Sequence, residues 1–145
     1  MGEISMKRYP FLLVAALAAA PLAGCGTGAP NMDAAAACKE YRAWMGANAA
    51  TFKGINVGSS SDMKKVAEAL KSGSEKVSSL SASVKTADPL LSGIMGDLAA
   101  AQSEAAATTA DYAAGNSGLA REAGLKIAAS FPKIDDVDTA CKGRS

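Results

Sequence analysis

The chain has no histidine, and aromatic residues make up only 5% of its 145 residues. Histidine is the commonest general base and the commonest metal ligand in proteins, so its absence removes most catalytic and metal-binding arrangements. The 15 basic and 14 acidic residues give a formal net charge of +1, so there is no basic field to hold nucleic acid. The length fits one domain. We therefore expect no enzymatic activity, no metal, no cofactor and no nucleic-acid partner.

The first 24 residues have the composition of an export signal. Lys7 and Arg8 precede an apolar run over residues 11–20, and small residues follow it. A basic start, a short apolar core and small residues before a cleavage point are typical of a secretory signal peptide. The run is too short to cross a bilayer, because a spanning helix needs about 20 apolar residues. The segment is therefore predicted to be a signal rather than a membrane anchor.

The signal ends in Leu22-Ala23-Gly24-Cys25, which resembles the lipobox of bacterial lipoproteins. This resemblance implies that the Cys25 thiol carries a diacylglyceryl group, that residues 1–24 are removed, and that Cys25 becomes the first residue. It also implies attachment to the cell membrane at its extracytoplasmic face. The alternative is an ordinary signal peptide with a chance cysteine at the cleavage point. The remaining chain has 13 basic and 13 acidic residues, so its attachment would depend on the lipid and not on charge.

Lipid attachment at Cys25 leaves two other cysteines, Cys38 and Cys141. Two thiols in an exported chain are most simply interpreted as one disulfide. A redox or zinc pair is the alternative, but the chain has no Cys-x-x-Cys spacing and zinc would need two further ligands. We expect a structural bridge that joins the first helix to the C-terminal end.

The body is predicted to be all-α, an antiparallel bundle of three to four helices. Residues 25–33 have linker composition and are expected to form a flexible tether, and residues 34–145 form the bundle. Asp33, Ser59 and the pair Asp88-Pro89 are the expected helix starts. Apolar or small residues then recur at steps of three and four, which predicts packed helical faces. On the first three helices these are Ala37, Tyr41, Trp44, Asn48 and Phe52; Met63, Val66, Leu70, Gly73, Val77, Leu80 and Val84; and Leu91, Ile94, Leu98, Ala101, Ala105, Thr108 and Tyr112.

A fourth helix is expected after the turn at residues 115–118. Leu119, Ala123, Ile127 and Phe131 lie on one face of it, and Pro132 is predicted to end it because proline lacks the helical donor. Asp135 is then the expected cap of a last turn that carries Cys141 inward. The large apolar and aromatic residues of the body number only 25, so the predicted core is lean and depends on helix-forming alanine and on the disulfide.

Two motifs suggest chemistry that the rest of the chain does not support. Ser61 and Lys64 match the Ser-x-x-Lys nucleophile motif of penicillin-binding enzymes, but the Ser-Asp-Asn element that these enzymes also need is missing. The acidic run at residues 135–138 lacks the glycine and glutamate that a calcium loop places after its first ligands. A helix cap and a solvated turn explain both.

Two functions remain open. The layout of lipobox, linker, alanine-rich helices and two distant cysteines resembles small secreted lipoproteins of unknown function from high-GC Gram-positive bacteria. That resemblance favours a membrane-anchored, non-enzymatic interaction module whose partner is an envelope protein or the cell wall. The alternative is a carrier of a small apolar ligand or lipid, with a groove between helices lined by Trp44, Met45, Met63 and Met95.

Overall fold

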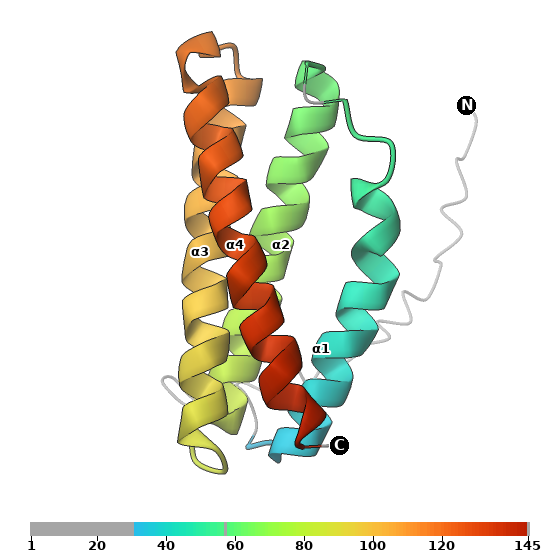
Figure 1. The fold of residues 1–145 in the computed structure, drawn as a ribbon, viewed down its shortest axis with the longest axis vertical. Coiled ribbons are helices and arrows are strands. Elements are labelled where there is room, and N and C mark those ends of the chain that lie inside the picture. The colour runs from blue at the N-terminus through green and yellow to red at the C-terminus, as the bar shows by residue number, and fades with distance from the viewer. Residues whose placement is uncertain (1–30, 57, 145) are drawn as a thin grey trace, which may run out of the picture.

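A computed structural model describes residues 31–56 and 58–144 and confirms the all-α prediction. Four helices run alternately up and down, and the first and last meet at one end of the molecule (Figure 1). In chain order they are α1 Ala34–Asn48, α2 Ser60–Val84, α3 Pro89–Ala113 and α4 Ala120–Lys142. Two short 3₁₀ turns, η1 Ala49–Phe52 and η2 Ser117–Leu119, follow α1 and precede α4. The signal peptide and the boundary between residues 24 and 25 lie outside the described residues.

The three expected helix starts are confirmed. The Asp33 carboxylate accepts a hydrogen bond from the Ala36 amide at 2.7 Å. Ser59 Oγ accepts one from the Asp62 amide at 3.3 Å, and the Asp88 carboxylate accepts one from the Leu91 amide at 2.9 Å. Each cap satisfies an amide of the first helical turn that has no partner within the helix, so short-range sequence chemistry alone fixes where the helices begin.

The core consists of two apolar clusters stacked along the bundle. The larger cluster surrounds the disulfide and includes Tyr41, Val77, Leu91 and Met95, all fully buried. The smaller cluster lies towards the other end and consists of Met63, Val66, Leu70, Ala105 and Ala106. Helix α1 buries only residues from its first half, namely Ala37, Cys38 and Tyr41. The second half of α1 therefore has much less apolar contact with the bundle than the other helices have.

Trp44 and Gly73 meet midway along the bundle. A Cβ added to Gly73 would stand 2.8 Å from the end of the Trp44 indole and 3.0 Å from Gln102 Oε1. Glycine at this position therefore lets the Trp44 ring approach the α2 backbone directly. Residue 73 belongs to the predicted face of α2, and this contact is the physical reason for its small side chain.

The prediction that Pro132 ends the fourth helix is wrong. Helix α4 continues through Pro132 to Lys142, and Asp135 lies within it rather than at a new cap. Pro132 and Ala128 are exposed, so the Ala128 carbonyl that lacks its helical donor lies at a solvent-exposed position. Buried side chains on both sides of the proline, Ser130 and Val137, hold the helix in place.

Two aromatic side chains expected inside are partly exposed. Phe131 is 57% exposed because the buried face of α4 passes through Ser130 instead. Phe52 is 45% exposed because α1 ends at Asn48, before the predicted periodicity reaches it. Helix α3 buries more than the predicted face. A second buried stripe on α3, which the sequence pattern did not predict, consists of Ser92, Met95, Ala99, Gln102, Ala106 and Thr109.

Candidate functional site

The predicted lipid attachment site, Cys25, lies outside the described residues. The described chain begins at one defined end of the bundle, because the Met32 amide donates a hydrogen bond to the Ser83 carbonyl at 2.8 Å. Ser83 lies in the last turn of α2. This contact fixes the end of the bundle from which the predicted tether starts.

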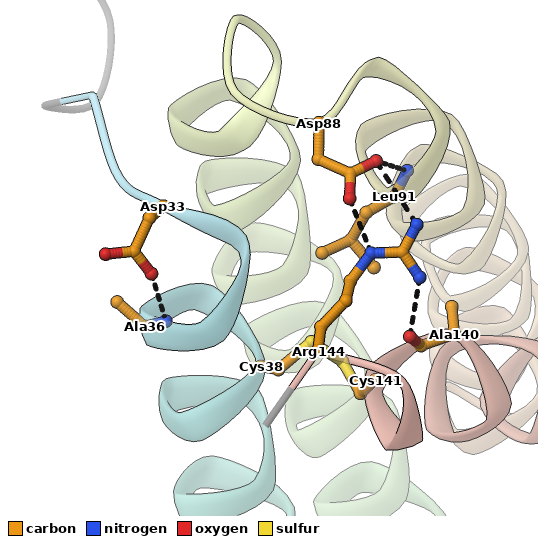
Figure 2. Close-up of a disulfide and its surroundings, with 8 residues drawn as sticks. All are labelled: Asp33, Ala36, Cys38, Asp88, Leu91, Ala140, Cys141 and Arg144. Atoms are coloured by element: carbon orange, nitrogen blue, oxygen red, sulfur yellow. Dashed lines mark hydrogen bonds and ion pairs between the residues drawn. A yellow bond between two sulfur atoms is a disulfide. The ribbon is translucent and has the colours of Figure 1, made fainter.

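The predicted disulfide between Cys38 and Cys141 is confirmed at the same end (Figure 2). The two Cα atoms are 5.4 Å apart, and both residues are fully buried. The bridge joins α1 to the last turn of α4 across 103 residues of sequence. The bridge pairs both cysteines of the described residues.

Beside the disulfide, an ion pair joins Arg144, which follows α4, to Asp88 at the start of α3. The Arg144 guanidinium donates to both carboxylate oxygens of Asp88 and to the Ala140 carbonyl, as Figure 2 shows. Asp88 is also the cap of α3, so one carboxylate holds the start of α3 and the end of α4 together. The hydrogen bond from Arg144, together with the Leu91 amide, lowers the pKa of Asp88 below its ordinary value.

The residues predicted to line an apolar groove do not line one together. Met95 is fully buried in the larger cluster and Met63 is buried in the smaller one. Met45 packs against the larger cluster, and the Trp44 ring reaches towards Gly73. In this fold the two buried methionines fill gaps in the core, which is the commoner use of this flexible side chain.

A groove of about 660 Å³ instead runs between α2 and α3. Its lining is mostly apolar and is dominated by alanine. Ala67 and Ala106 are buried at its base, and Ala107 and Ala110 of α3, with Ala114 at the end of that helix, are exposed. Four charged side chains of α2 also line the groove, namely Lys64, Glu68, Lys71 and Glu75. This groove was not predicted from the sequence, although two features of the sequence indicate it. These are the alanine-rich residues 105–114 and the charges spaced by three and four in residues 64–75.

A smaller recess between α1 and α4 carries charges of both signs. It has a volume of about 490 Å³, and its lining includes Arg42, Asp135 and Asp138. The nearby Tyr41 hydroxyl is buried without a hydrogen-bond partner among the described residues. Burial, with the charges of Asp138 and Asp135 adding to it, raises the pKa of Tyr41. Tyr41 is therefore a neutral packing residue at any ordinary pH.

The residues considered for catalysis and for calcium binding lie on helices at ordinary surface positions. Ser61 and Lys64 are both exposed in the first turns of α2, and Asp135 and Asp138 lie within α4. Across residues 31–56 and 58–144, no three His, Cys, Asp or Glu side chains are grouped as metal ligands would be. In the same part of the chain, no helix combines the length and the apolar character needed to span a membrane.

Comparison with protein-family models, with curated proteins and with solved structures finds no match for this chain.

Proposed function

We propose that this chain is a lipid-anchored protein of the extracytoplasmic membrane face that acts as a non-enzymatic interaction module. The observation that carries this proposal is Leu22-Ala23-Gly24-Cys25 directly after a signal-like segment. The buried Cys38–Cys141 bridge supports it, because disulfides form and persist mainly in exported compartments. The anchor would be the diacylglyceryl group on Cys25.

The α2–α3 groove is the surface that this module would use. Its alanine floor is accessible, and the charged side chains along α2 provide directional contacts. An envelope protein would be the partner class, since alanine side chains beside charges of both signs allow a helix to approach closely and to form ion pairs.

Labelling with palmitate tests the anchor directly. Cells that produce the chain are grown with labelled palmitate, separated into membrane and soluble fractions, and compared with a Cys25→Ser variant. We expect label and membrane association in the wild type and neither in the variant. An unlabelled wild-type chain would contradict the proposal, and a Lys39→Glu variant serves as a control whose labelling should not change.

Carriage of a small apolar ligand is the second candidate, and the groove volume is the observation that favours it. About 660 Å³ falls within the roughly 300–1,000 Å³ that small-molecule sites occupy. Native mass spectrometry of the full-length protein purified from membranes would reveal such a ligand as extra mass beyond the attached acyl chains. Absence of any extra mass would count against a carrier.

A further inference from the structure

The charged side chains along the α2 side of the α2–α3 groove form no ion pair with any residue that the structure describes. Lys64, Glu68, Lys71 and Glu75 are all exposed, and no ion pair involving any of them is found among the described residues. Their spacing would permit ion pairs along the helix. Other exposed charges do pair between helices, such as Lys126 with Glu104 at 2.8 Å. The groove wall is thus a row of charges that remains available to a partner.

The order of these charges is self-complementary. Read along α2 the signs are plus, minus, plus, minus, and a two-fold axis centred between residues 69 and 70 exchanges Lys64 with Glu75 and Glu68 with Lys71. We propose that the groove is the docking surface for a second copy of this chain, whose α2 lies antiparallel across it. A two-fold interface makes every contact twice, so four opposite-charge pairs would form. This inference rests on the proposed function only in treating the groove as a protein-binding surface.

The floor of the groove fits the same partner. Ala107 and Ala110 on α3, and Ala114 directly after it, are exposed and carry no charge, so a neighbouring helix can approach closely without burying an unpaired charge. The charged wall runs from Lys64 to Glu75, 11 helical steps and therefore about 16 Å. A helix with the same charge order and the same length matches the wall along its whole extent, whereas an anion or a cation would meet repulsion at every second position.

Sedimentation velocity of the full-length protein, purified from membranes in a mild detergent, tests the association. We expect a concentration-dependent dimer for the wild type. Lys71→Glu places Glu opposite the partner's Glu68 at two symmetric positions, and should weaken the dimer by about 10-fold or more. Lys39→Glu reverses an exposed lysine of α1 outside the groove and should leave the dimer unchanged.

Reversal of all four charges supplies the decisive comparison. The variant Lys64→Glu/Glu68→Lys/Lys71→Glu/Glu75→Lys keeps the spacing of opposite charges along α2 and keeps the symmetric pairing. It should therefore form its own dimer as well as the wild type does. It should not form mixed dimers with the wild type, because all four pairs would then join like charges. Free mixing of the two chains would overturn the proposed pairing.

The floor is tested with matched substitutions on α3. Ala107→Gln places a longer side chain in the groove and should weaken the dimer, whereas Ala100→Gln is exposed outside the groove and should not. Circular dichroism of every variant confirms that it is folded. A wild-type chain that carries palmitate but stays monomeric at all concentrations would overturn this inference and leave the anchor standing. A wild-type chain that dimerises but carries no palmitate would support the pairing and overturn the anchor.

Discussion

Gly73 is the residue whose replacement most directly tests the packing of the bundle. Alanine normally stabilises a helix by about 1 kcal/mol over glycine. At position 73, however, the new Cβ would stand 2.8 Å from the Trp44 ring, and overpacking of this kind costs about 1–3 kcal/mol. We expect Gly73→Ala to lower the free energy of unfolding by about 1 kcal/mol, measured by urea denaturation.

Gly93 supplies the matched control for this substitution. It also lies inside a helix, but a Cβ added there meets no atom within 4 Å. Gly93→Ala should therefore raise the free energy of unfolding by about 0.5–1 kcal/mol. Equal effects of the two substitutions would show that Trp44 does not pack on α2 as described.

Ionisation of Asp88 should make the stability of the protein depend on pH in the acid range. Its pKa is lowered mainly by the hydrogen bond from Arg144, so the folded state favours the ionised carboxylate. The resulting stabilisation is present above the ordinary aspartate pKa, about 3.9, and is lost as the pH falls through the lowered folded value. We expect Asp88→Asn to melt at a lower temperature than the wild type at pH 6, with the difference shrinking as the pH approaches 2. A difference that stays constant over this range would contradict the assigned role.

Within α4, Pro132 interrupts the helical hydrogen bonds. Proline within a helix removes one hydrogen bond and costs about 3 kcal/mol, and here the carbonyl left over is that of exposed Ala128. We expect Pro132→Ala to raise the free energy of unfolding by about 2 kcal/mol, measured by urea denaturation. Pro132→Gly restores the donor but has poor helix propensity, so its gain should be about 1 kcal/mol smaller. No gain with alanine would mean that α4 does not continue through residue 132.

Helix α1 depends on the disulfide more than any other element does. Only residues of its first half are buried, and the bridge to Cys141 is in that half. On the chain-entropy model a bridge closing about 100 residues contributes up to about 4.7 kcal/mol. We expect Cys38→Ala/Cys141→Ala to increase amide hydrogen exchange most strongly in α1, with α2 and α3 least affected. Uniform loss of protection throughout the molecule would show that α1 is an integral part of the core.

The same elements show what the sequence could and could not predict. The starts of α1, α2 and α3 were predictable because Asp33, Ser59 and Asp88 act on amides three residues away. The disulfide followed from a count of thiols. The continuation through Pro132 was not predictable, because it depends on burial of Ser130 and Val137 by other helices. The groove was missed for a similar reason, since only the packed fold shows which faces of α2 and α3 remain uncovered.

At the scale of the whole molecule, the proposed dimer and the proposed anchor together constrain how the protein lies on a membrane. Antiparallel pairing about residues 69 and 70 places the two disulfide ends, marked by the bond from Met32 to Ser83, about 40 Å apart. The seven Cα–Cα steps from Cys25 to Met32 can span at most about 25 Å. If the dimer stood upright, one anchor could not reach the bilayer.

The dimer should therefore lie with its helices along the membrane plane. Polarised infrared spectroscopy of the acylated protein on supported bilayers measures this through the dichroism of the helical amide band. We expect helices parallel to the surface for the wild type and for the variant with all four charges reversed. Lys71→Glu, held by a single anchor per monomer, should show a broader distribution of orientations, because one tether at one end of the bundle does not fix its tilt. Upright helices in the wild type would contradict either the antiparallel pairing or the attachment at Cys25, and palmitate labelling of the same sample distinguishes the two.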